Sequence, residues 1–320
     1  MEQIKLETDY GFDSIYKRWN GKFLTDECYD QIISPTKDTA VYKPGASLYE
    51  STPLVYIMCD IYDDDNDTIL DCLKTIEDTS KMRANVSGPI LDEDMKARGI
   101  EEYRLRTPNS YQVKTKAGKW GLIAYANEIH SVMAGWKRGR FTGKIEESGW
   151  SKDNADKFNI IKNIQKYNER AFEKADSKRY IAQKVFAENS ILPEHRVGIV
   201  TTFSMNRYCD LGLGSGGMSC HIDSGDNEQG MTTMCHFRDG DYEGAYLTWP
   251  RYGIAINAPH NSVIIADSLE LHGVTPIKGK GTRYTCVAYC DRRLATKGQL
   301  GKTEKKIGKI KETSSLDGFF

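Results

Sequence analysis

The sequence predicts an α+β protein whose core is an antiparallel β-sandwich or jelly roll backed by helices, preceded by a mixed N-terminal region. Two observations lead to this fold class. Beyond Pro193, runs rich in β-branched and aromatic residues recur at short intervals between Gly, Asp, Asn and Pro, which is typical of many short antiparallel strands. In residues 152–189, apolar side chains recur at helical spacing, as expected for helices that cover a sheet.

Residues 1–150 form the mixed α/β N-terminal region, and the sequence does not reveal its role. A helix is expected from Thr68 to Arg83. A β-hairpin is expected in "VKTKAGKWGLIAYA", with its turn at Ala117-Gly118. Residues 60–71 are strongly acidic, and no chemical motif is visible in this region.

Three further segments follow along the chain. Residues 151–193 are expected to form two consecutive supporting helices that stop at "LPEH". Residues 194–293 are the expected strand-rich core. Residues 294–320 form a basic tail rich in lysine and glycine, and we expect this tail to be mobile.

The composition is that of an ordinary globular protein. The 44 Lys and Arg residues balance 45 Asp and Glu, so the net charge names no partner. No stretch approaches the roughly 20 apolar residues that span a bilayer, and the N-terminus lacks the apolar core of a signal peptide. The eight cysteines form no C-x-x-C pair and are expected to be reduced, mostly buried thiols. We therefore expect a soluble intracellular protein without a membrane partner, nuclear in a eukaryote and cytoplasmic otherwise.

His221 and Asp223 stand two residues apart in "HIDSGD", at the end of a strand-like run. Residues i and i+2 of a strand point to the same face, so these two side chains can chelate one metal ion. Of the other histidines, only His272 starts a strand-like run directly after a buried one. Two imidazoles and one carboxylate that leave the opposite positions open are the ligand set of non-heme Fe(II) oxygenases. The sequence therefore predicts that His221, Asp223 and His272 bind iron.

Arg283 lies one predicted strand further on, in "GTRYTCVAYC". Its planar guanidinium suits a bidentate hold on a carboxylate, which is the task of anchoring the distal end of 2-oxoglutarate. Each of these signals is weak when taken alone, because an H-x-D sequence is common by chance. The agreement of spacing, strand context and a following arginine favours the metal site.

Zinc is the alternative metal, because it also accepts two histidines and a carboxylate around a hydrolytic water. No glutamate obviously stands by as a general base, and a zinc site leaves Arg283 without a task. Iron is therefore preferred.

Two glycine-rich stretches resemble phosphate loops but lack the required context. Gly212–Gly217 contains a formal G-x-G-x-x-G, but a strand-like run follows it where a dinucleotide site needs a helix, so we expect a flexible loop near the site mouth. The "GKGT" at residues 279–282 is better explained as the hairpin turn that presents Arg283.

The strand-rich segment resembles the TET/JBP-like family of Fe(II)/2-oxoglutarate-dependent dioxygenases, which oxidise 5-methyl groups of pyrimidines in nucleic acid. The resemblance covers about Val197 to Asp291 and rests on "TTFSMN", "HIDSGD", "GDYEGAYLTWPRYGIAI" and "LHGVTPI" followed by "GTRYTCVAYC". It implies a double-stranded β-helix with Fe(II) held by the His221, Asp223 and His272 side chains and 2-oxoglutarate held by Arg283 and the iron. O2 would be the cosubstrate, and succinate a coproduct.

The resemblance also bears on individual side chains. Asn206 looks like a polar residue that the family keeps, so it is a candidate for contact with the cosubstrate or the base, and a strand-end hydrogen bond is the alternative. Because Asp223 retains the carboxylate ligand, hydroxylation is favoured over halogenation. Tyr246 and Trp249 are expected in the core.

The substrate needs other evidence, because the same ligand set serves enzymes that act on DNA, RNA, proteins and small molecules. A nucleic-acid surface requires basic and aromatic side chains close together, and the sequence offers them at Trp136, Lys137, Arg138 and Arg140. A solvated basic loop is the alternative. With the resemblance, we predict oxidation of the 5-methyl group of 5-methylcytosine or thymine in DNA, with RNA as a further candidate partner. A small-molecule or protein hydroxylase of the same fold is the alternative, and a non-catalytic nucleic-acid-binding module comes third.

Overall fold

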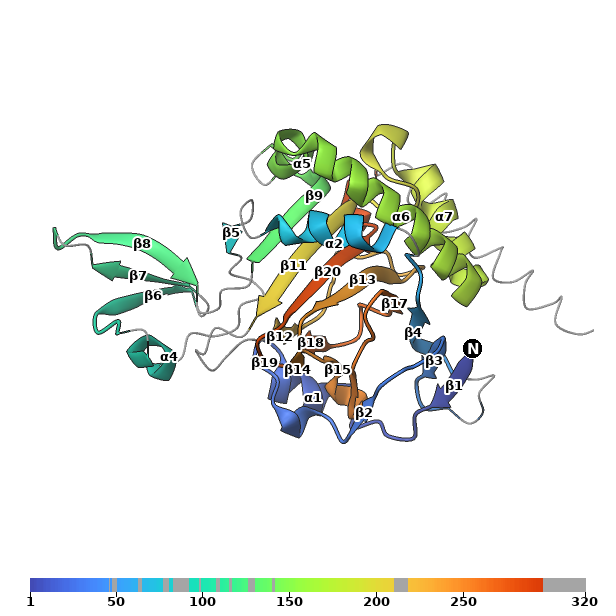
Figure 1. The fold of residues 1–320 in the computed structure, drawn as a ribbon, viewed down its shortest axis with the longest axis horizontal. Helices are drawn as coiled ribbons and strands as arrows, with labels where there is room; N and C mark the ends of the chain where they lie inside the picture. Colours follow the sequence, from blue (N-terminus) through green and yellow to red (C-terminus); the bar gives the residue numbers. More distant parts are fainter. Residues whose placement is uncertain are drawn as a thin grey trace, which may run out of the picture.

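The fold is seen in a computed structural model (Figure 1). The structure describes residues 1–45, 47, 51–62, 65–76, 81–82, 92–97, 99–107, 110–114, 117–125, 130–139, 142–209 and 218–295. The predicted glycine loop at 212–217 and nearly all of the predicted basic tail lie outside these residues.

The centre of the molecule is a large, mostly antiparallel sheet, here called the major sheet. Its strands run in the order β1-β3-β4-β17-β13-β20-β11-β9-β10, and β5 pairs with β9 beside this path. Only β1 and β3 pair in parallel within it. The bounds in this order are Glu2–Lys5, Thr39–Tyr42, Pro53–Cys59, Ser262–Ala266, Thr232–Asp239, Thr282–Tyr289, Thr202–Cys209, His130–Arg138 and Ile145–Glu147, with β5 at Lys81–Met82.

A smaller sheet, here called the minor sheet, packs against one face of the major sheet. Its order is β12-β18-β15-β16-β2, with bounds Met218–His221, His272–Val274, Leu247–Trp249, Ile254–Ile256 and Gln31–Ile33. A ribbon of β14 (Tyr242–Gly244) and β19 (Ile277–Gly279) lies beside it. A hairpin sheet of β6 (Tyr103–Thr107), β7 (Ser110–Lys114) and β8 (Trp120–Tyr125) stands apart from both sheets in Figure 1.

Helices cover the other face of the major sheet. Figure 1 shows α2 (Asn66–Lys74), α6 (Ala155–Ala175) and α7 (Ser177–Ser190) lying across it. Shorter helices are α1 (Phe12–Trp19), α4 (Asp92–Ala97), α5 (Gly149–Asp153) and the single 3₁₀ turns η1 (Asp26–Cys28), η4 (Pro193–His195), η5 (Pro250–Tyr252) and η6 (Arg292–Leu294). None of the helices in the described part of the chain is long and apolar enough to cross a membrane.

Strand alternation in β20 shows how the sequence separates the two faces. Tyr284, Cys286 and Ala288 are buried in the apolar cluster beneath the helices, together with Phe158 and Phe172 of α6. The residues between them on β20 point to the other face, because successive side chains of a strand alternate. Burial of each large apolar side chain contributes about 1.5–3 kcal/mol, so this cluster fixes the register of the strand.

The break between the two long helices is set by Asp176. Its backbone N–H donates to Phe172 O and closes α6, and its side chain then accepts a hydrogen bond from Arg179 N at 3.0 Å in the first turn of α7. This is the N-cap role that aspartate performs well. The two predicted supporting helices are therefore present.

The α+β class with a jelly-roll core is confirmed, and the hairpin with its turn at Ala117-Gly118 is present as β7 and β8. The helix predicted from Thr68 is shorter, because α2 ends at Lys74, where Thr75 Oγ1 donates to Cys72 O and competes with the helical pattern. All eight cysteines are free thiols, mostly buried as expected.

The N-terminal region contributes directly to both sheets. β3 and β4 extend the major sheet beyond β17, and β2 pairs in parallel with β16 of the minor sheet. The boundaries predicted at residues 150, 193 and 293 stay predictions. Both sheets contain strands from before and after residue 194.

Candidate active site

A cavity of about 360 Å³ opens between the two sheets, within the size range of small-molecule sites. The major sheet contributes side chains from β11, β13 and β20, and the minor sheet contributes β12, β15 and β18. The polar residues in its wall include every metal and cosubstrate ligand predicted from the sequence: Asn206, His221, Asp223, His272 and Arg283.

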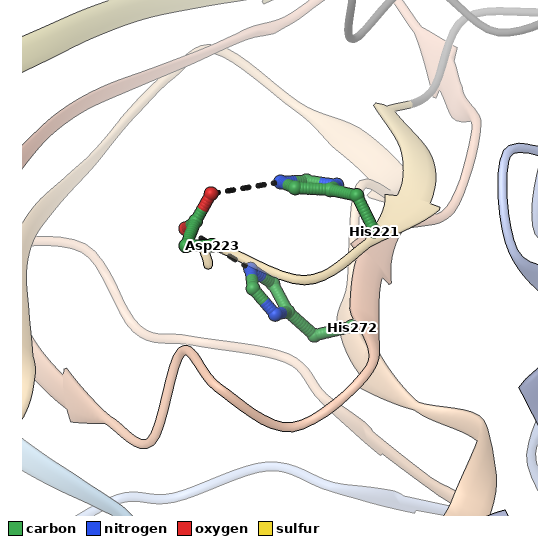
Figure 2. A group of neighbouring side chains, drawn as sticks. All are labelled: His221, Asp223 and His272. Carbon is green, nitrogen blue, oxygen red and sulfur yellow. Dashed lines mark ion pairs between the residues drawn. The ribbon is translucent and has the colours of Figure 1, made fainter. Parts of the chain in front are cut away.

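The structure brings His221, Asp223 and His272 together (Figure 2), and one ligand atom from each lies within 4.8 Å of the others. His221 ends β12 and is the register partner of His272 at the start of β18. Asp223 lies just past the end of β12, where the loop turns its carboxylate toward both rings. Asp223 Oδ1 is 3.6 Å from His221 Nε2, and Asp223 Oδ2 is 3.7 Å from His272 Nε2.

Backbone carbonyls orient both imidazoles. His221 Nδ1 is 2.7 Å from Ser219 O, and His272 Nδ1 is 2.8 Å from Glu270 O. A carbonyl oxygen only accepts hydrogen bonds, so each Nδ1 must carry the proton, and the Nε2 lone pair of each neutral imidazole is left to bind a metal ion. Burial, and then the neighbouring His221, lower the pKa of His272, which favours the neutral, metal-binding form.

Arg283 lies on β20 and is 1% exposed. Its Nε has no hydrogen-bond partner, and no carboxylate in the described part of the chain forms an ion pair with its guanidinium. Its NH2 donates to Met234 Sδ at 3.9 Å, and its Cζ lies 5.2 Å from the centroid of the Tyr208 ring. Burial lowers the pKa of Arg283, which reflects the cost of holding this cation away from water. A buried cation with unused donors on a cavity wall fits the carboxylate of a bound acid.

Asn206 is buried on β11, opposite Thr285 of β20. Its Oδ1 accepts a hydrogen bond from Ser131 Oγ at 2.7 Å, and its Nδ2 donates to Ser204 O at 3.3 Å. The side chain thus lines the cavity and is also held by hydrogen bonds within the sheet. Its contact with a cosubstrate or a base stays a prediction.

Thr285 and Asp226 are among the polar cavity residues that the sequence-based prediction did not include. Thr285 shares a strand face with Arg283, and its buried hydroxyl has no hydrogen-bond partner in the described structure. Asp226 accepts hydrogen bonds from Thr232 and from Ser268, the latter at 2.7 Å. Burial, and then the charge of Asp223, raise the pKa of Asp226 to about 7. The i+2 spacing of Thr285 from Arg283 is a signal that could have identified it.

The predicted nucleic-acid residues occupy different environments. Trp136 is half-buried and packs against the apolar cluster under the helices, with its ring 5.9 Å from that of Phe158. Its contact with nucleic acid stays a prediction. Arg138 is exposed, but its guanidinium donates to the carbonyls of Gly143 and Arg293. Lys137 is exposed and lies 3.9 Å from a carboxylate oxygen of Glu146. Arg140 lies outside the described residues.

Trp249 is buried, as expected, and forms part of the cavity wall with its ring 6.4 Å from that of His272. No glutamate lines this cavity in the described structure. A zinc site would still leave Arg283 without a task, so iron stays the preferred metal.

Comparison with known proteins defines the class. Residues 218–292 match the family model described as the oxygenase domain of the 2OGFeDO superfamily, named Tet_JBP, and this match spans the metal cluster and Arg283. The chain is therefore a dioxygenase that uses Fe(II) and 2-oxoglutarate. Within that class, residues 218–292 are similar to the TET/JBP-like enzymes. No curated protein sequence matches the chain.

Solved structures give the same fold. The structure described as "NgTET1 in complex with 5mC DNA" has a TM-score of 0.50 and 9% sequence identity, covering 89% of this chain and 93% of that one. At this identity the likeness establishes the fold alone.

Two further structures match less well. The viral collagen prolyl hydroxylase from Paramecium Bursaria Chlorella virus-1, solved as a 2OG complex, has a TM-score of 0.32 and 10% identity, covering 73% of this chain and 94% of that one. A 2OG-Fe(II) family oxidoreductase from Burkholderia pseudomallei has a TM-score of 0.30 and 11% identity, covering 69% and 89%. These scores are too low to carry an argument.

Proposed function

We propose that this protein oxidises the 5-methyl group of a pyrimidine, 5-methylcytosine or thymine, in DNA, with succinate and CO2 as coproducts. The observation that carries the proposal is one cavity in which a His-Asp-His cluster faces a buried arginine that has no carboxylate partner among the described residues. The choice of substrate is supported by the Tet_JBP match and by a shared fold with a protein solved in complex with 5mC DNA.

The residues present fit both cofactors. The Nε2 atoms of His221 and His272 and the carboxylate of Asp223 would hold Fe(II), because the backbone already fixes the tautomer of each imidazole. The unused donors of Arg283 and the hydroxyl of Thr285 would hold the distal carboxylate of 2-oxoglutarate. When bound, iron and 2-oxoglutarate supply the oxidising chemistry with O2.

The protein's own contribution is binding, orientation and exclusion of water. Arg283 and Thr285 on the major sheet would fix one end of the cosubstrate, and the three metal ligands on the other side of the cavity would fix its reactive end. The apolar side chains of Met234, Leu247 and Val274 line the same cavity and limit the water around the reacting atoms. A methylated base would have to leave the duplex to reach this enclosed site.

The test is to incubate the protein with Fe(II), 2-oxoglutarate, ascorbate and air, with DNA that contains 5-methylcytosine and thymine, and to quantify oxidised nucleosides by mass spectrometry. We expect hydroxymethylated bases with the native protein and none with His221→Ala. Succinate formation that is independent of DNA and yields no oxidised base would contradict the substrate and favour the small-molecule or protein hydroxylase.

A further inference from the structure

The segment between β17 and β18, residues 267–271, supports two of the three metal ligands, and we call it the ligand loop. Ser268 O accepts a hydrogen bond from the backbone N–H of Asp223 at 3.0 Å. Glu270 O accepts the Nδ1 proton of His272 at 2.8 Å. A displacement of this loop would therefore move the Asp223 carboxylate and rotate the His272 imidazole at the same time.

A lysine from the N-terminal region joins the two ends of the ligand loop. Lys43 follows β3, and its Nζ lies 2.9 Å from Asp267 Oδ2 and 2.7 Å from Glu270 Oε1. The three side chains are only 18%, 15% and 13% exposed, so water and salt screen these ion pairs less than surface pairs. Asp267 also lines the cavity that holds the metal ligands.

Arg251 also contacts the ligand loop. Its NH1 lies 3.3 Å from Glu270 Oε2, and its guanidinium makes a bidentate pair with Asp9 at 2.9 and 2.8 Å. Tyr252 Oη donates to Glu270 Oε1 at 2.9 Å. The Glu270 carboxylate is therefore fully engaged, and it holds the backbone whose carbonyl orients His272.

Without Lys43, the loop would keep two poorly solvated carboxylates, and Arg251 reaches only one of them. Their mutual repulsion and their need for water would favour a more open loop. The two hydrogen bonds to Asp223 and His272 would then lose their fixed geometry. Partners of this kind, one step outside the metal ligands, commonly change metal affinity by about 10–100-fold.

We propose that Lys43 is a positioning residue of the metal centre. Its ion pairs with Asp267 and Glu270 fix the ligand loop, and the loop in turn holds the Asp223 and His272 side chains in the orientation that binds the metal. This assigns a role to part of the N-terminal region, which lies outside the segment that matches the oxygenase family. The proposal concerns metal binding and is independent of which substrate the enzyme oxidises.

The test is a titration of the metal-free protein with Co(II) without cosubstrate or DNA, followed by the visible absorption of the bound ion. We expect Lys43→Met to weaken Co(II) binding about tenfold and to alter the absorption bands. Lys43→Arg keeps the charge and should retain most of the affinity. Lys37→Met is the matched control, because Lys37 lies near the other end of β3 in an exposed pair with Glu2 at 3.7 Å, and it should bind Co(II) normally.

Co(II) affinity and bands of Lys43→Met that match those of the native protein would overturn the proposal. An equal loss in Lys43→Arg would overturn its charge-based explanation. If Lys43→Met does not fold, Glu270→Gln tests the same ion pair through its acidic partner. Native Co(II) affinity in Glu270→Gln would also overturn the proposal. Because no substrate is present, failure here is distinguishable from failure of the proposed reaction.

Discussion

Replacing Arg283 with methionine separates what this residue costs the folded protein from what it contributes to cosubstrate binding. Arg283 is 1% exposed, and its Nε makes no hydrogen bond. The lowered pKa that burial gives it shows that the fold holds the charge at a cost. Methionine fills a similar volume without a charge, so the variant tests the electrostatic role with little change in packing.

The magnitudes follow from the contacts of the guanidinium. Removing a buried, unpaired charge relieves a desolvation penalty of several kcal/mol, which stabilises the folded protein. Loss of the contact with the Tyr208 ring destabilises it by about 0.5–2 kcal/mol. We expect Arg283→Met to stabilise the metal-free, cosubstrate-free protein by about 1–2 kcal/mol. At about 2–4 °C per kcal/mol, this raises Tm by roughly 2–8 °C.

The same substitution should abolish the response to 2-oxoglutarate. Each charge-assisted hydrogen bond to a carboxylate contributes about 1.5–3 kcal/mol, so losing two of them weakens binding by roughly 10²–10⁴-fold. The assay is thermal unfolding with and without 2-oxoglutarate in the presence of Mn(II). A variant that is less stable than the native protein, yet still gains Tm with 2-oxoglutarate, would refute this reasoning.

Four further predictions follow from individual side chains. His221→Ala should abolish both the visible Co(II) spectrum and succinate formation, whereas a retained spectrum would contradict its role as a ligand. Thr285→Val removes one hydrogen bond of about 1 kcal/mol and should raise the KM for 2-oxoglutarate about fivefold, while Thr285→Ser should leave KM unchanged. Asp176→Ala should lower the unfolding free energy by about 1 kcal/mol in urea titrations, with the exposed Lys178→Ala near zero as control. Burial lowers the pKa of His236 well below its usual value. The unfolded chain therefore takes up a proton at His236 below about pH 6.5 while the folded protein does not, and the unfolding free energy declines as the pH falls. His236→Gln should flatten that decline between about pH 7 and 5.5.

The metal cluster could be predicted from the sequence because each of its parts leaves a recognisable local pattern. His221 and Asp223 are two residues apart, and His272 begins a strand-like run that in the structure pairs with β12. Arg283 follows at the start of the next long strand. The hairpin turn predicted at 279–282 is wrong, because β19 pairs with β14 and β20 pairs with β11 and β13. Asp223 itself lies past the end of β12, so the loop, and not strand alternation, turns its carboxylate toward the histidines.

The N-terminal strands could not be placed in this way. β4 pairs with β17, and β2 pairs with β16, across most of the length of the chain, and such pairings leave no local pattern. For the same reason nothing in the sequence connects Lys43 with Asp267 and Glu270, since lysine and acidic residues are common on surfaces. Their low exposure is visible only in the structure.

The packing of Trp136 against the core could have been predicted from the alternation of residues in its strand. It alternates with Val132 and Ala134 on β9, and both of these side chains are buried beneath the helices. Period-2 alternation therefore places Trp136 on the buried face and Lys137 on the exposed one. The neighbouring basic residues point to a surface, but this alternation separates the aromatic side chain from it.

The most direct test of the central claim is to measure succinate and oxidised pyrimidine in the same reaction with DNA that contains 5-methylcytosine or thymine. We expect one succinate for each oxidation step on the base, with both products lost in His221→Ala. Succinate without any oxidised base, or oxidised bases that persist in His221→Ala, would contradict it.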